Sequence, residues 1–76
     1  MEIKESVRIH DFRFELNLKV DLELMYADII SVTTYFIGID DFGVKLSRSG
    51  STYVLDAYLE EIQDNIDNII SKLTLN

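Results

Sequence analysis

The sequence predicts an α+β domain in the order β-α-β-β-α, a three-stranded antiparallel sheet with two amphipathic helices on one face. Residues 12–20 alternate strictly between apolar and polar side chains, and residues 59–73 repeat apolar side chains at steps of three and four. The first pattern is typical of a half-buried strand and the second of an amphipathic helix. Nothing in the chain resembles a linker or a repeat, so we expect residues 1–76 to form one domain.

The first predicted strand is FRFELNLKV at residues 12–20, in which the even-numbered residues are apolar. One face of this strand can therefore pack while the other meets water. In residues 1–9 the apolar residues occupy odd positions, so the phase slips at His10 and Asp11, where we expect a bulge or a turn. Residues 1–9 are either an extra N-terminal edge strand or an extension of the main strand, and the pattern does not decide between them.

A helix is predicted over residues 22–36, after Asp21 as a candidate N-cap. Its apolar residues again recur at steps of three and four, which would place them along one stripe. The segment SVTTYFI at 31–37 is rich in β-branched and aromatic residues, which suit a strand. The sequence therefore leaves open whether residues 30–37 are helix or strand.

The rest of the chain predicts a turn, a hairpin and a last helix. GIDDFG at 38–43 contains two glycines and paired aspartates, the residues that turns favour. Residues 44–59 alternate on both sides of RSGS, which predicts a β-hairpin. From about residue 60 the apolar stripe predicts a helix with a polar and mostly acidic opposite face.

Composition limits the classes of function. The chain has no cysteine and one histidine, which excludes disulfides and a tetrahedral zinc site of nitrogen and sulfur ligands within one chain. Its formal charge of −7 argues against autonomous nucleic-acid binding. A domain this short has a thin core, so we expect self-association or a partner subunit to supplement it. We also expect a soluble cytoplasmic protein, since no membrane span or secretory signal is visible.

No reaction centre can be recognised. His10 beside Asp11 suggests a general base, but neighbouring residues on an extended segment point to opposite faces. Asp40 and Asp41, with Asp28 or Asp56, offer carboxylates for a hard cation without the spacing of a calcium loop. We therefore predict no catalytic, cofactor-binding or metal-binding residue, and a protein that is not an enzyme.

The predicted order of elements, and VKLSRSGSTYVLDAYLEEIQDNIDNIISKL at 44–73, resemble the CTAG/Pcc-type small dimerisation subunit of the KEOPS (EKC) complex. Residues 66–70, Ile-Asp-Asn-Ile-Ile, lie where that family carries an Asn-Ser signature, and Asp67 and Asn68 depart from it. The resemblance implies a non-catalytic accessory subunit that is a divergent or paralogous member of the family. It would dimerise, dock its helices on the catalytic subunit and support formation of threonylcarbamoyladenosine at position 37 of tRNA. ATP and iron chemistry would belong to the partner subunits, and tRNA would be met at most through the complex.

The resemblance predicts two interaction surfaces, and one alternative function stays open. The apolar helical residues are expected to bind the protein partner, and bulky residues of the predicted hairpin are expected to form the interface of a homodimer or heterodimer. The alternative is an acidic inhibitor or mimic, viral or antitoxin-like, whose last helix occupies a basic groove. The partner-binding residues are Leu22, Met25, Ile29, Ile62, Ile66 and Ile69; the dimer residues are Tyr53, Val54 and Tyr58; the acidic residues are Glu60, Glu61, Asp64 and Asp67.

Overall fold

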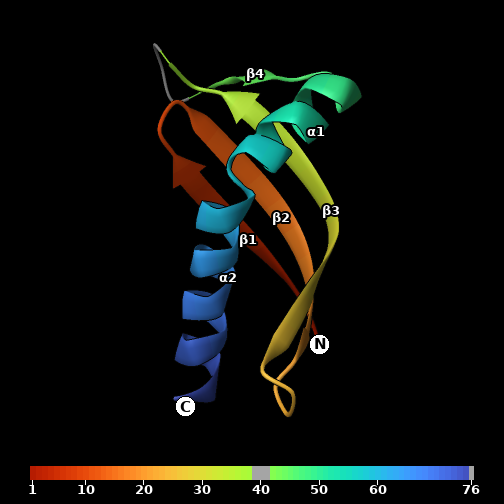
Figure 1. Cartoon of the computed structure of the whole chain (residues 1–76), viewed down its shortest axis with the longest axis vertical. Helices are drawn as coiled ribbons and strands as arrows, with labels where there is room; N and C mark the ends of the chain where they lie inside the picture. Colours follow the sequence, from red (N-terminus) through yellow and green to blue (C-terminus); the bar gives the residue numbers. More distant parts are fainter. Residues whose placement is uncertain (39–41, 76) are drawn as a thin grey trace.

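A computed structural model of the chain describes residues 1–38 and 42–75 and shows an antiparallel sheet covered on one face by two helices (Figure 1). The four strands follow one another in space as they do in sequence, and the helices come last. The α+β class is therefore confirmed, but the sheet has four described strands and the order of elements differs from the predicted one. The elements are β1 (Glu2–Ile9), β2 (Phe12–Asp21), β3 (Tyr26–Phe36), β4 (Val44–Lys45), α1 (Arg48–Ala57) and α2 (Leu59–Thr74).

Strand β1 is a separate edge strand, which settles the conformation of residues 1–9. It pairs with β2 along its whole length, from Glu2 opposite Lys19 to Ile9 opposite Phe12. The phase slip predicted at residues 10–11 is the tight turn that joins the two strands. His10 has a φ of 53° there, a left-handed conformation that glycine adopts more easily.

The two faces of the sheet differ as the alternation in residues 12–20 predicts. The even-numbered residues of β2 face the helices, and Phe14, Leu16 and Leu18 are at most 1% exposed. The opposite face carries polar cross-strand contacts, such as the hydrogen bond of 2.6 Å from Asn17 to Ser31. This face has no helix over it within the described part of the chain, and its polar side chains allow it to meet water.

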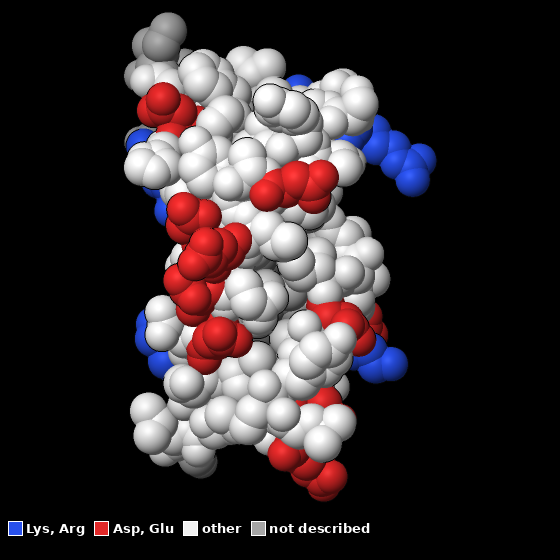
Figure 2. Space-filling view, viewed as in Figure 1, with Lys and Arg blue, Asp and Glu red and all other residues white. Residues whose placement is uncertain are grey.

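Helix α2 closes the core against the middle of the sheet. Ile62, Ile66 and Ile70 lie one helical turn apart, and all are buried. The predicted C-terminal helix is thus confirmed, and its buried column runs through Ile70, while Ile69 and Leu73 are only half-buried. The acidic residues of α2 occupy the outer side, as Figure 2 shows in red along that helix.

The helix predicted over residues 22–36 is wrong. Residues 22–25 form a turn, and residues 26–36 form β3, which pairs with β2. The register shifts between Asn17 and Leu18 of β2, which leaves Ile30 as the extra residue of a β-bulge. Because of this bulge, the residue that follows Ile29 on the face toward the helices is Val32, three positions later instead of two. A spacing of three is also typical of a helix. The β-branched and aromatic residues of 31–36 had indicated the strand.

The hairpin predicted over residues 44–59 is also wrong. Only Val44 and Lys45 form a strand, and the chain then enters α1. The side-chain oxygen of Ser47 accepts a hydrogen bond of 3.2 Å from the backbone N–H of Gly50, so Ser47 caps the helix that was predicted to be a turn. The predicted turn at 38–43 falls largely on residues 39–41, which lie outside the described residues.

Candidate functional site

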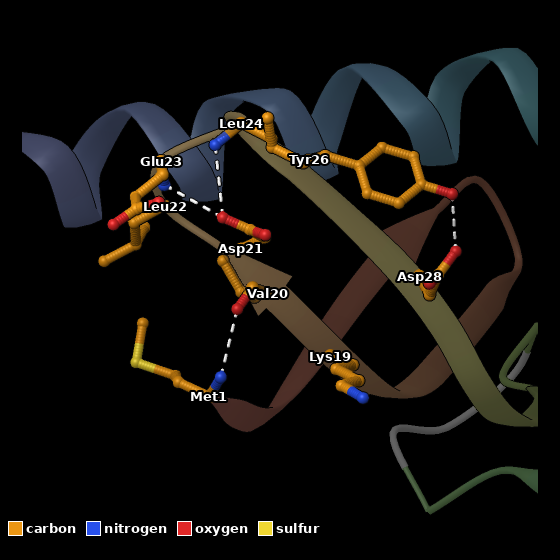
Figure 3. Close-up of a pocket in the computed structure, with 9 residues that line it drawn as sticks. All are labelled: Met1, Lys19, Val20, Asp21, Leu22, Glu23, Leu24, Tyr26 and Asp28. Atoms are coloured by element: carbon orange, nitrogen blue, oxygen red, sulfur yellow. Dashed lines mark hydrogen bonds between the residues drawn. The ribbon is translucent and has the colours of Figure 1, made fainter.

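A group of exposed apolar side chains surrounds the β2–β3 turn, and we call it the apolar tip. Leu24 is 74% exposed, Tyr26 55% and Met25 50%. A hollow of about 630 Å³ beside the turn is lined by Met1, Leu22, Leu24 and Tyr26 together with neighbouring polar residues, while Met25 lies outside its lining (Figure 3). The N-terminus and the C-terminal end of α2 lie at the same end of the molecule (Figure 1). The apolar tip consists of Met1, Leu22, Leu24, Met25 and Tyr26.

The backbone of the tip is fixed by Asp21, which follows the last buried residue of β2. One carboxylate oxygen of Asp21 accepts hydrogen bonds from the N–H groups of Glu23 at 3.0 Å and Leu24 at 3.1 Å. This local pattern starts a tight turn in the same way that an N-cap starts a helix. The N-cap predicted at Asp21 is therefore the cap of a turn, and it holds the side chain of Leu24 out in solvent.

Met25 is the unusual residue of this turn. Its φ is 54°, in the left-handed region that glycine and asparagine favour. A residue with a Cβ atom costs about 1–2 kcal/mol in that conformation. The chain therefore places a large apolar side chain where stability would favour a small or polar one, which makes the tip a candidate for a contact with another molecule.

The N-terminus and Tyr26 complete the tip. The amino group of Met1 donates a hydrogen bond of 3.0 Å to the carbonyl oxygen of Val20, and the Val20 N–H donates one of 2.7 Å to the Met1 carbonyl. The Tyr26 hydroxyl donates a hydrogen bond of 2.6 Å to Asp28. This hydrogen bond and the negative charge of Asp28 raise the pKa of Tyr26 above its ordinary value of 10.0.

The chemistry of the tip is that of a docking surface. Its apolar side chains are bordered by the carboxylates of Asp21, Glu23 and Asp28, and the cations that line the hollow are Lys19 and the amino group of Met1. Within residues 1–38 and 42–75, no group of three or more His, Cys, Asp or Glu side chains could hold a metal ion. Such a surface can bury apolar area against a partner and select it by charge at the rim.

The predicted partner-binding residues divide into two groups in the structure. Leu22, at 39% exposed, and Met25 belong to the tip. Ile62 and Ile66 are fully buried against the sheet, so they hold the fold together and are closed to a partner. Ile29 on β3 and Ile69 on α2 are half-buried; the structure does not bring the six residues together as one surface.

The predicted dimer residues lie on α1 and at its junction with α2. Tyr53 is 78% exposed, while Val54 and Tyr58 are half-buried and pack against the core. The ring of Tyr58 lies 5.7 Å from that of His10 and 5.8 Å from that of Phe12, measured between centroids. Tyr53 is thus the accessible member of this set, and dimerisation through it stays a prediction.

The remaining residues considered for chemistry lie apart from the tip. His10 is an exposed turn residue stacked near Tyr58, at the other end of β2. Asp40 and Asp41 lie outside the described residues. Among the tip residues, sequence reasoning missed Met1, Leu24 and Tyr26; the signal was the run Leu-Glu-Leu-Met directly after a strand, where a polar turn would be usual.

Comparison with known proteins adds no family. Searches against protein-family models, curated proteins and solved structures each found no match. In the part of the chain that the structure describes, no helix has the length and apolar character needed to cross a membrane.

Proposed function

We propose that the protein is a non-catalytic binding module that docks on a partner protein through its apolar tip. The observation that carries the proposal is Met25, which holds an exposed apolar side chain in a conformation that turns reserve for glycine or asparagine. The total accessible surface supports a docking role as well. It is 5461 Å² for a chain of 8.8 kDa, compared with about 4800 Å² for a typical monomer of this mass.

A protein partner fits the tip better than a lipid surface does. Asp21, Glu23 and Asp28 surround the apolar side chains, and the whole chain carries a charge of −7. Anionic membranes repel such a rim, whereas a protein groove with basic residues around an apolar floor complements it. Leu24 would enter the groove, with Met25 and Tyr26 beside it.

The proposal is tested by charging the tip without touching the core. Leu24→Asp should abolish capture of a partner from native lysate, because it puts a carboxylate into the apolar contact. Val44→Asp is the matched control, since Val44 is 67% exposed and lies away from the tip. If both variants keep the wild-type partner with unchanged affinity, the tip is not the docking surface.

A role as the small subunit of a KEOPS-type complex is the narrower form of this proposal. It draws on the resemblance of residues 59–73, which form α2, and on a sheet with two helices on one face. It loses support from residues 22–36 and 44–59, whose helix and hairpin the family resemblance assumed. The direct test is binding to the catalytic subunit of such a complex and rescue of threonylcarbamoyladenosine synthesis, with Leu24→Asp as the control.

The acidic outer side of α2 favours a second candidate, an inhibitor that occupies a basic groove. Exposed carboxylates run along this helix and gather on one side of Figure 2. Salt separates the two functions, because the Debye length falls below about 10 Å above 0.1 M salt. Docking by the tip should survive 0.5 M salt, whereas capture through Glu60, Glu61, Asp64 and Asp67 should weaken steeply.

A further inference from the structure

The outer edge of β3 lies open beside a second groove, remote from the apolar tip. Strand β4 pairs with β3 only at Tyr35 and Phe36, and the N–H of Leu46 then donates a hydrogen bond of 2.9 Å to the carbonyl of Thr34. At Ser47 the chain leaves the sheet and enters α1. Among the described strands, none pairs with the outer side of residues 26–33.

Val32 is the next residue along this edge whose backbone can form hydrogen bonds with an added strand. Backbone groups alternate between the two sides of an antiparallel strand, so Val32 directs its N–H and C=O to the same outer side as Thr34. A groove of about 630 Å³ runs beside Val32 and extends from residues 30–34 to residues 45–48 and the first turns of α1. A strand placed there would pair with β3 beyond the point where the chain leaves the sheet at Ser47.

The two edges of the sheet differ in how they are protected. The edge strand β1 carries four charged residues, Glu2, Lys4, Glu5 and Arg8, which discourage pairing with another strand. Along the open edge of β3, residues 26–33, Asp28 is the one charged residue, and residues 29–33, IISVT, contain no charge, no proline and no glycine. An edge of this composition favours the addition of a strand.

The charge of the groove identifies the kind of strand. The chain has 14 acidic residues and 7 basic ones, yet no carboxylate lines the groove and two cations do, Lys45 and Arg48. Neither cation forms a salt bridge with a carboxylate in the described part of the chain.

We propose that this groove binds a short extended segment of another protein that carries Asp or Glu, by adding it as a strand to the edge of β3. Its backbone would pair with Val32, and its carboxylate would meet Lys45 and Arg48. A second copy of the chain fits less well, because the bulge at Ile30 puts the two halves of β3 out of phase along the edge. This binding mode is independent of the apolar tip.

Peptide selection on the intact protein tests the proposal. Sequences enriched from a random library should contain Asp or Glu among β-branched residues. A selected peptide should shift the amide signals of residues 30–34 and 45–52 in a ¹⁵N-labelled sample, and its Asp→Asn or Glu→Gln counterpart should bind at least about tenfold more weakly because it loses a charge-assisted contact. Arg48→Glu should cause a loss of similar size, while Lys4→Glu on the far edge should leave affinity unchanged.

The outcomes are decisive in both directions. Enrichment of peptides without acidic residues, failure to enrich any peptide, or full affinity in Arg48→Glu would overturn the groove proposal. Circular dichroism of Arg48→Glu establishes that α1 is intact, and Lys45→Glu provides a second variant if it is not. Leu24→Asp should bind the selected peptide as the wild type does, so failure of this proposal and failure of the tip proposal can be told apart.

Discussion

Replacing Met25 by glycine should stabilise the fold and weaken partner binding together. The left-handed φ of 54° costs a residue with a Cβ atom about 1–2 kcal/mol. Glycine removes this cost but loses about 0.5–1 kcal/mol of chain entropy. The expected net gain is about 0.5–1 kcal/mol in the free energy of unfolding, which corresponds to a rise in Tm of roughly 2–8 °C for a domain of this size.

The same substitution deletes an apolar side chain from the proposed docking surface. Met25→Gly should therefore weaken partner binding by about 1–2 kcal/mol, which is about 5- to 30-fold. Thermal unfolding followed by circular dichroism gives Tm, and isothermal titration with the captured partner gives the affinity. The two quantities should move in opposite directions, which a purely structural role of Met25 does not produce.

His10→Gly is the matched control for this experiment. His10 has nearly the same φ, 53°, but lies in the β1–β2 turn at the other end of β2. Its replacement should also raise Tm, by less, because the contact with the ring of Tyr58 is lost. Partner affinity should stay unchanged in His10→Gly. A lower Tm in Met25→Gly, or an unchanged affinity, would refute the interpretation of the tip.

Three further predictions concern the core and the titration of the tip. Ile66→Ala should lower the free energy of unfolding by about 2–4 kcal/mol in urea denaturation, because Ile66 is fully buried; a loss below 1 kcal/mol would contradict this packing. Thr34→Val should cost about 1–3 kcal/mol in the same assay, since the buried hydroxyl of Ser51 would lose its partner at 2.7 Å; an unchanged midpoint would show that water replaces it. Because the pKa of Tyr26 is raised, the hydrogen bond between Tyr26 and Asp28 stabilises the fold below pH 10, and this stabilisation is lost as pH rises through the folded-state pKa. Asp28→Asn should lower the pKa of Tyr26, measured by ultraviolet titration near 295 nm. An unchanged pKa would show that Asp28 is not the cause of the shift.

The elements that the sequence predicts well are those whose pattern is uninterrupted. Residues 12–20 alternate without a break and form β2, and the apolar stripe of residues 59–73 forms α2. In β2 one period describes the burial of the strand, whereas in α2 the buried column runs through Ile70 and leaves Leu59 exposed. Residues 30–37 carry signals for both helix and strand, and the strand that their β-branched residues favour is the one that forms, with residues 30–36 as part of β3.

Residues 22–36 could not be assigned from periodicity, because two features combine to imitate a helix. The β2–β3 turn contributes Leu22 and Met25, which are apolar for a reason other than the core. The bulge at Ile30 then shifts the phase of β3 by one residue. Neither feature leaves a residue type that marks it, since no glycine or proline occurs in this stretch.

The hairpin prediction for residues 44–59 failed for a different physical reason. Alternation and a helical period overlap over short distances, so RSGS between apolar residues is compatible with a hairpin turn and with a capped helix. The hydrogen bond from the Gly50 N–H to the side chain of Ser47 favours the helix locally. The buried hydrogen bond between Thr34 and Ser51 favours it through tertiary structure, because it joins β3 to α1. This pair links distant parts of the chain, and a sequence pattern does not show it.

Two departures from sequence rules in this chain lie at the candidate surfaces, while the left-handed φ of His10 lies outside both. Met25 breaks the preference of a turn, and the uncharged outer edge of β3 at residues 29–33 breaks the protection that β1 keeps. Both departures cost stability or solubility in a lone molecule, while the core follows the expected pattern. We propose that contacts with other proteins offset these costs, which the chain keeps at two separate places above a thin core.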